Sequence, residues 1–168
     1  MATDTLTDEA LLRLAVRVGR ALRARGLRVA TAESCTGGWI AKVLTDIPGS
    51  SDFFEEGLVT YANLAKQRRL AVGARLLAGS GAVSEQAVRA MATGVLRGSA
   101  ASCAVAVSGI AGPGGAVPGK PVGTVWICWA RRSASGLHTS VELHRFRGDR
   151  DTVRRRTVRR ALQGLLAP

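Results

Sequence analysis

Apolar residues recur every three or four positions in three long stretches of the chain, which is the spacing of an amphipathic helix. The first stretch lies between Thr7, a residue suited to cap a helix, and Gly26, a residue suited to end one. The second follows Ser84, another capping residue. The third starts at Arg150 or Asp151 and carries apolar residues on one side and arginines on the other. These stretches predict three long helices.

Between the helices lie shorter apolar or alternating stretches that predict strands. The stretch 102–109 is almost entirely apolar, which indicates a strand buried on both faces. Other strands are expected at residues 27–32, 57–61, 124–130 and 136–146, the last two paired through a turn at 131–136. Shorter helices are expected at 36–45 and from Asn63 onward. Alternating strands and helices favour α/β layers around a mixed sheet.

The composition agrees with one α/β domain spanning residues 1–168. Hydrophobic residues make up 46% of the chain but aromatics only 4%, which favours helices packed closely on a sheet over a β-sandwich. No apolar run reaches the ~18 residues of a membrane span, and residues 1–14 do not resemble a signal peptide. The three cysteines are widely spaced, which fits reduced thiols and a cytoplasmic location.

The net charge of +12 raises the question of an anionic partner. The arginines concentrate in residues 13–28 and 145–160, where they punctuate amphipathic helices. No aromatic residues interleave with them to stack on bases. We therefore favour a solvated arginine-rich surface over a nucleic-acid site, and binding of a small anionic substrate remains open.

The segment "ESCTGG", residues 33–38, is the first candidate site. It joins a strand to a helix, where free backbone N–H groups can bind an anion or an oxyanion. Ser34 or Cys35 would be placed there to attack a carbonyl, and Gly37 and Gly38 allow close approach to the backbone. The alternative is that Ser34 or Thr36 merely caps the helix, and this segment by itself favours that alternative.

A nucleophile also needs a base. The two histidines both lie on the late strand 136–146, and neither forms a recognisable triad pattern. Lysine is rare in this arginine-rich chain, and a buried lysine can lose its proton whereas an arginine cannot. Lys66 lies on a short helix that begins just after a strand, and Tyr61 lies at the tip of that strand, so the two residues are candidates to converge on one pocket. A surface position for Lys66 is the equally weighted alternative.

Two further segments are candidates for ligand contacts. The Gly- and Pro-rich loop 109–121 follows a buried strand, a position that often lines ligand sites in α/β folds. Ser108, at the exit of that strand, is placed to donate a hydrogen bond into the same space. Arg150, after the turn at Gly148, is suited to bind a phosphate in bidentate fashion, or alternatively to pair with a neighbouring aspartate.

Several of these segments together resemble the CinA C-terminal domain family, which includes nicotinamide-nucleotide amidases. The matching motifs are "TAESCTGGWIAKVLTDIPGSSDFFEEGLVTYANLAKQ", "GAVSE", "SGIAGPGG", "KPVGTVW" and "FRGDRDTVRR". They occur in order over residues 8–165. The resemblance implies a three-layer α/β/α fold with a mixed, largely parallel sheet. It also implies hydrolysis of the carboxamide of nicotinamide mononucleotide to nicotinate mononucleotide and ammonia, a step in pyridine-nucleotide recycling.

The resemblance also assigns roles to residues. It implies a catalytic set of Ser34 as nucleophile, Lys66 as base and Tyr61 beside them. In this scheme Lys66 or Tyr61 returns the proton to the departing ammonia. Residues expected to contact substrate are Thr36, Gly37, Gly38, Ser108, Gly109 and Arg150. Neither a metal nor a cofactor is expected. The chain departs from the family at Leu64, often acidic, and at Ser80-Gly81, often a histidine, which affects the edge of the pocket.

The expected partner is a small nucleotide substrate, not a membrane or a nucleic acid, and a homo-oligomer is expected. Two alternatives stay open. One is a Ser-Lys amidase for another small amide. The other is a non-catalytic nucleotide- or nucleic-acid-binding module linked to competence or DNA damage, suggested by the charge.

Overall fold

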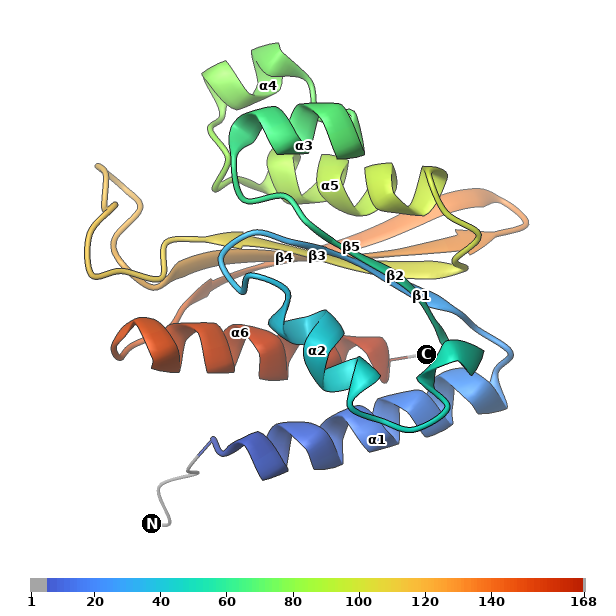
Figure 1. The fold of residues 1–168 in the computed structure, drawn as a ribbon. Helices are drawn as coiled ribbons and strands as arrows, with labels where there is room; N and C mark the ends of the chain where they lie inside the picture. The colour runs from blue at the N-terminus through green and yellow to red at the C-terminus, as the bar shows by residue number, and fades with distance from the viewer. Residues whose placement is uncertain (1–5, 168) are drawn as a thin grey trace.

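The structure, a computed structural model, describes residues 6–167. Residues 1–5, on which part of the expectation about a signal peptide rests, lie outside the described residues. Figure 1 shows a central sheet with helices on both faces. The five strands lie in the order β2-β1-β3-β4-β5. Their bounds are β1 Val29–Glu33, β2 Phe54–Val59, β3 Cys103–Gly109, β4 Thr124–Ser133 and β5 Gly136–Arg145.

The sheet is mixed, as expected, but parallel pairs form only half of it. β1 pairs in parallel with β2 and with β3, whereas β4 is antiparallel to both β3 and β5. The antiparallel half follows from the connections. A loop without a helix joins β3 to β4, and a tight hairpin joins β4 to β5. A parallel pair needs a longer crossover, usually through a helix.

Three helices cover each face of the sheet, which confirms the three-layer α/β/α arrangement. One face carries α1 Asp8–Ala24, α2 Trp39–Thr45 and α6 Arg150–Leu165, while α3 Asn63–Leu70, α4 Ala74–Gly79 and α5 Glu85–Arg97 lie on the other. A short 3₁₀ helix, η1, spans Ser50–Asp52. Each face has its own core of buried aliphatic residues. None of the helices in residues 6–167 combines the length and apolarity that crossing a membrane requires.

The helix caps read from the sequence are present. The Thr7 hydroxyl accepts a hydrogen bond from the Ala10 N–H, and the Ser84 hydroxyl accepts one from the Ala87 N–H. The last helix begins at Arg150, after Asp149 as its cap. These local signals placed the three long helices correctly.

Several elements differ from the sequence prediction. Helix α2 begins at Trp39 and not at Thr36, because residues 35–38 form a turn, and η1 was not predicted. β2 covers residues 54–59, not 57–61, because its ladder with β1 ends where Glu33 pairs with Val59. Tyr61 therefore lies after the strand and not at its tip. Helix α4 was not predicted, since it has only six residues and no side-chain cap.

Close packing of α3 on α5 positions the helix that carries Lys66. Gly94 of α5 faces the end of α3, and a Cβ built on Gly94 would lie 2.1 Å from the Leu70 carbonyl oxygen. Such an approach is far inside van der Waals contact, so only glycine fits without moving α3.

We therefore expect Gly94→Ala to lower the free energy of unfolding by roughly 1–3 kcal/mol, although alanine is favoured over glycine in a helix by about 1 kcal/mol. Gly79→Ala is the matched control, because nothing lies within 4 Å of its added Cβ. That variant should be as stable as the parent chain or more so. Urea unfolding measures both changes, and equal stability of the two variants would contradict the packing argument.

Candidate active site

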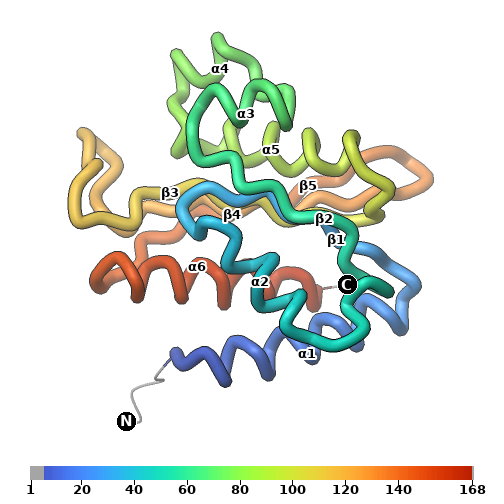
Figure 2. The backbone as a smooth tube through the Cα atoms, in the orientation of Figure 1, coloured from blue at the N-terminus to red at the C-terminus, as the bar shows by residue number. Residues whose placement is uncertain are grey.

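The strands of the parallel half bring the predicted site residues to one edge of the sheet. β1, β2 and β3 run in the same direction, so their carboxyl ends meet at the same edge. Ser34 follows β1 directly, and its N–H donates to the Val107 carbonyl of β3. Lys66 lies on α3, which follows β2. Figure 2 traces β1 into α2 and β2 into α3 from this edge.

Ser34 and Lys66 are in direct contact. Lys66 Nζ lies 3.1 Å from Ser34 Oγ, 2.8 Å from the Thr60 carbonyl oxygen and 3.0 Å from the Tyr61 carbonyl oxygen. Lys66 is 1% exposed and Ser34 is 9% exposed. Lys66 is therefore a buried lysine within reach of a hydroxyl, and the alternative of a surface lysine is wrong.

The burial of Lys66 shifts its protonation equilibrium towards the neutral amine. Burial lowers the pKa of Lys66 from its ordinary value, and no carboxylate of residues 6–167 forms an ion pair with it. A neutral amine has two hydrogens and one lone pair. As an ammonium, Lys66 donates to Ser34 Oγ. As a neutral amine, it could donate to the two carbonyl oxygens and accept the Ser34 hydroxyl proton with its lone pair.

Cys35, the other candidate nucleophile, lies in the core beneath the turn. It is 5% exposed and belongs to the apolar cluster on the α1, α2 and α6 face. Burial, together with the nearby Glu33 carboxylate, raises the pKa of the Cys35 thiol to about 12. The thiolate is the reactive form of cysteine, so this environment favours Ser34 as the nucleophile.

Tyr61 contacts Lys66 through its backbone and not through its phenol. Its side chain is 58% exposed, and its hydroxyl accepts a hydrogen bond from Arg150 Nη2 at 2.9 Å. Arg150 Nη1 donates to the Gly112 carbonyl oxygen at 2.7 Å. Arg150 thus links the start of α6 to the Gly- and Pro-rich loop and to Tyr61, which places the phenol and this guanidinium together at the rim of the site.

Glu33 is the site residue that the sequence reading missed. It is fully buried, and its carboxylate accepts hydrogen bonds from the Thr36 hydroxyl and from the N–H groups of Gly38, Ile40 and Ala41. The sequence predicts that an anionic ligand binds at the start of this helix, but the Glu33 carboxylate is the anion that accepts these N–H groups. The signal was an acidic residue directly before the turn.

The turn therefore offers fewer free donors than expected. The Gly37 N–H donates to the Ser34 carbonyl oxygen, and the Gly38 N–H donates to Glu33. Of the three N–H groups expected to bind an oxyanion, only that of Thr36 has no acceptor within the described part of the chain. This corrects the expectation that the glycine N–H groups face a ligand. Gly37 and Gly38 instead adopt positive φ angles that shape the turn.

Ser108 and Gly109 lie at the same edge but are engaged within the protein. The Ser108 hydroxyl donates to the Ala82 carbonyl oxygen at 2.8 Å, on the α5 side of the sheet. A Cβ on Gly109 would lie 2.6 Å from Val125 Cγ2, so this glycine permits the close approach of β4. The Ser108 hydroxyl therefore has its donor engaged within the protein and does not offer it to a ligand.

Arg154 is a second residue that the sequence reading missed. Its Nε donates to the Cys35 carbonyl oxygen at 3.1 Å, and its Nη2 donates to the Thr36 carbonyl oxygen at 2.9 Å. The available signal was its position four residues after Arg150, one turn further along the same helix.

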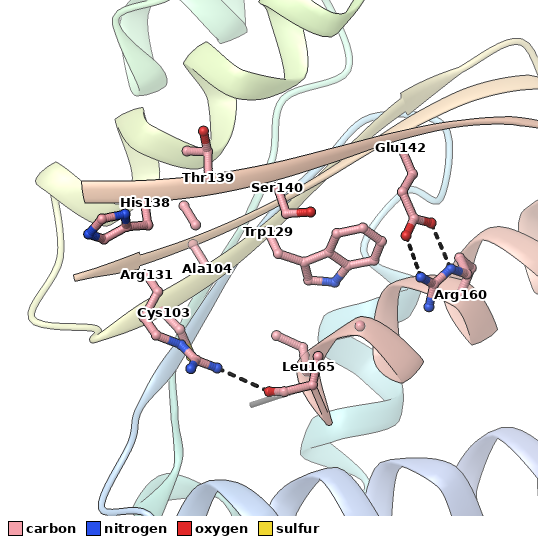
Figure 3. Close-up of a pocket in the computed structure, with 13 residues that line it drawn as sticks. Cys103, Ala104, Trp129, Arg131, His138, Thr139, Ser140, Glu142, Arg160 and Leu165 are labelled. Carbon is pink, nitrogen blue, oxygen red and sulfur yellow. Dashed lines mark hydrogen bonds and ion pairs between the residues drawn. The ribbon is translucent and has the colours of Figure 1, made fainter. Parts of the chain in front are cut away.

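A separate hollow of about 430 Å³ lies between β4, β5 and the end of α6. Figure 3 shows Trp129, Arg131, His138 and the Glu142–Arg160 ion pair around it. None of the predicted site residues lines it. Burial raises the pKa of its one thiol, Cys103, to about 11, so this thiol is not activated as a nucleophile.

The described residues, 6–167, contain no cluster of three or more His, Cys, Asp or Glu side chains placed to hold a metal ion. The site consists of a serine, a buried lysine, a nearby arginine and a turn in which the Cys35 and Thr36 N–H groups have no acceptor among residues 6–167.

Comparisons with known proteins agree with the motifs. The CinA C-terminal domain matches residues 11–167. The nicotinamide-nucleotide amidohydrolase PncC of Escherichia coli (strain K12) is 53% identical over 160 residues, covering 95% of each chain. The protein of the same name from Pseudomonas putida is 52% identical over 153 residues, covering 91% of this chain and 93% of its own.

A solved structure has the same fold. The competence/damage inducible protein CihA from Agrobacterium tumefaciens superposes with a TM-score of 0.89 at 45% identity, covering 95% of this chain and 94% of its own. With a family match over nearly all of its length, this chain belongs to the CinA C-terminal domain family.

Proposed function

We propose that this protein hydrolyses the carboxamide of nicotinamide mononucleotide to nicotinate mononucleotide and ammonia, with Ser34 as nucleophile and Lys66 as base. The observation that carries the proposal is the 3.1 Å contact between Ser34 Oγ and the buried Lys66 Nζ. The amidohydrolase names of relatives at about 53% identity support the substrate.

The proposed reaction has two halves. Neutral Lys66 takes the Ser34 hydroxyl proton while Oγ attacks the amide carbon, and the carbonyl oxygen becomes an oxyanion. The C–N bond then breaks, and the proton on Lys66 passes to the leaving nitrogen, which departs as ammonia. Water attacks the remaining Ser34 ester with Lys66 again as base, which releases the carboxylate product and restores the serine.

Tyr61 has a different part in this scheme from the one first expected. Because its hydroxyl accepts from Arg150 and only its carbonyl oxygen contacts Lys66, we assign proton return to Lys66. Tyr61 and Arg150 together form the rim, and Arg150 is the proposed partner of the substrate phosphate. The positive charge of the pyridinium ring further favours neutral Lys66 in the complex.

We propose that this activity serves pyridine-nucleotide recycling. A cytoplasmic location and a homo-oligomeric state are also proposed, as the sequence analysis expects. A single domain over residues 1–168 also stays a prediction. The substrate is a small nucleotide, and no cofactor takes part in the proposed scheme.

The nucleic-acid alternative receives little support from the arginines of α6. Arg155 pairs with Asp8 and Asp151, Arg160 pairs with Glu142, and Arg156 donates to the Arg147 carbonyl oxygen. These side chains tie the helix to its neighbours, so they are already engaged in contacts that a phosphate backbone would have to displace.

The direct test is to incubate the purified protein with nicotinamide mononucleotide and to measure ammonia. We expect stoichiometric release of ammonia and nicotinate mononucleotide. Absence of ammonia from this nucleotide, with release from another small amide, would support the broader Ser-Lys amidase. Tight binding of a labelled DNA duplex at physiological salt, without ammonia release, would support the binding module instead.

A further inference from the structure

The Glu33 carboxylate is a buried charge surrounded by donors of the segment that follows it along the chain. Glu33 is 0% exposed. Its Oε2 accepts from the Thr36 hydroxyl at 2.6 Å, from the Gly38 N–H at 3.1 Å and from the Ile40 N–H at 3.0 Å, and its Oε1 accepts from the Ala41 N–H at 2.8 Å. Burying a carboxylate is costly unless such bonds replace those to water. The carboxylate therefore fixes residues 36–41 around itself.

The same segment holds the main chain of Ser34. The Gly37 N–H donates to the Ser34 carbonyl oxygen at 3.1 Å, and Gly37 lies between Thr36 and Gly38, which both donate to the carboxylate. On its other side, the Ser34 N–H donates to the Val107 carbonyl oxygen at 3.1 Å. Ser34 is thus held at its N–H by the sheet and at its carbonyl by the turn that Glu33 fixes.

The carboxylate lies on the opposite face of the sheet from the reacting groups. Glu33 and Ser34 are successive residues at the end of β1, where side chains alternate between the two faces. The carboxylate accepts from the start of α2, whereas Ser34 Oγ contacts Lys66 on α3, and Figure 1 shows these two helices on opposite faces. Glu33 therefore reaches Ser34 only through the backbone, and it does not touch Lys66.

We propose that Glu33 is a positioning residue that keeps Ser34 Oγ on Lys66 Nζ by fixing the turn that follows the nucleophile. The inference rests on the proposed function, because the 3.1 Å contact between these two atoms starts the proposed reaction. Lys66 Nζ is held independently, by the carbonyl oxygens of Thr60 and Tyr61. A displaced turn therefore moves the serine relative to a base that stays in place.

Glu33→Gln tests the role with almost no change in side-chain shape. Glutamine has one acceptor oxygen, and its NH₂ group cannot accept from an N–H. Since both oxygens of Glu33 accept from N–H groups, either orientation of the amide sets a donor against a donor. The turn must then move away from its present position.

Two control variants separate positioning from charge and from stability. Glu55→Gln makes the same chemical change on the neighbouring strand β2, where Glu55 pairs with Arg28. Leu22→Ala leaves a cavity in the core, because Leu22 is 1% exposed. Its carbonyl oxygen accepts from the Leu27 N–H, just before β1 begins, whereas Ser34 follows the end of that strand.

The experiment compares kcat, KM and the pH profile for nicotinamide mononucleotide well below the melting temperature of every variant. In Glu33→Gln we expect kcat to fall by about 10–100-fold, because small displacements of reacting groups cost this much. KM should stay within about threefold, and the pH midpoint should be unchanged because it belongs to Lys66. Both controls should keep kcat within about twofold. Equal kcat in Glu33→Gln and Glu55→Gln, or an equal loss in Leu22→Ala, would overturn the proposal.

Thr36→Val is the milder variant, which keeps the proposal testable if Glu33→Gln does not fold. It removes only the 2.6 Å bond from the Thr36 hydroxyl to the carboxylate. Thr36 is 0% exposed, so substrate does not reach this hydroxyl in the structure. We expect kcat to fall by about 3–10-fold with KM unchanged. A kcat equal to that of wild type would count against the positioning role.

A crystal structure of Glu33→Gln, or of Thr36→Val in its place, gives a readout that does not depend on activity. Ser34 Oγ should lie beyond hydrogen-bond distance of Lys66 Nζ in Glu33→Gln, and displaced in the same direction in Thr36→Val. Retention of the 3.1 Å contact refutes the positioning role. A wild-type protein that releases no ammonia refutes the proposed function instead, while the separation of these two atoms in the variant still decides whether Glu33 positions Ser34.

Discussion

Ser34→Ala is expected to lower the rate of ammonia release from nicotinamide mononucleotide by about 10³-fold or more. The variant removes the only atom in the proposed scheme that bonds to the substrate carbon, and neighbouring Cys35 cannot replace it. The Cys35 thiol is buried, and its pKa of about 12 keeps it protonated at neutral pH. The measurement is the initial rate at saturating substrate, with circular dichroism to check the fold.

Cys35→Ala is the matched control for Ser34→Ala. It removes the sulfur atom from the adjacent position and should keep the rate within about threefold, with a stability loss of roughly 1 kcal/mol from the small cavity. Activity that survives in Ser34→Ala and disappears in Cys35→Ala would transfer the nucleophile to the thiol. A burst of ammonia equal to the enzyme concentration, followed by slower turnover, would further support an ester on Ser34.

Replacing Lys66 is expected to have an effect of similar size. Lys66→Met and Lys66→Arg should both lower the rate by about 10³-fold, the first because it has no base and the second because arginine keeps its proton. Lys42→Arg is the control, since Lys42 is exposed and pairs with Asp46. Its rate should stay within about twofold. An active Lys66→Arg variant would exclude Lys66 as the base.

The pH dependence of the wild-type rate follows from the same group. Burial lowers the pKa of Lys66, and only its neutral form accepts the serine proton. The value of kcat/KM should therefore rise with pH to a plateau, with its midpoint below the ~10.4 of an exposed lysine. The midpoint for kcat should lie lower still, because the bound pyridinium disfavours the charged amine. Activity that falls with rising pH over this range would contradict the assignment.

Stability gives an independent check of that pKa. Between the lowered pKa in the folded protein and the ~10.4 of unfolded lysine, the unfolded chain binds more protons at this residue than the folded one. The free energy of unfolding of wild type relative to Lys66→Met should therefore rise with pH across this window. A flat difference, measured by urea unfolding at several pH values, would show that burial does not perturb Lys66.

The helices illustrate which parts of the fold are local. Thr7, Ser84 and Asp149 cap helices through hydrogen bonds to residues three positions away. Both partners of each bond therefore lie in one short stretch of sequence, where the pattern can be recognised. The end of β2 was misplaced because it depends on where pairing with β1 stops, and that pairing is not local. Helix α4 has no cap to mark it.

The chemistry of the site divides in the same way. The sequence by itself determined the α/β class and the position of Ser34 in a strand-to-helix turn. It also singled out Lys66, because lysine is rare in this arginine-rich chain. Only the tertiary structure decided that the Glu33 carboxylate accepts the Gly38 N–H, that the Tyr61 hydroxyl accepts from Arg150, and that Arg154 donates to the turn. Arg154 and Cys35 are 119 residues apart. Which donor meets which acceptor across such a distance depends on how α6 packs against the turn, because a hydrogen bond requires a separation of about 3 Å.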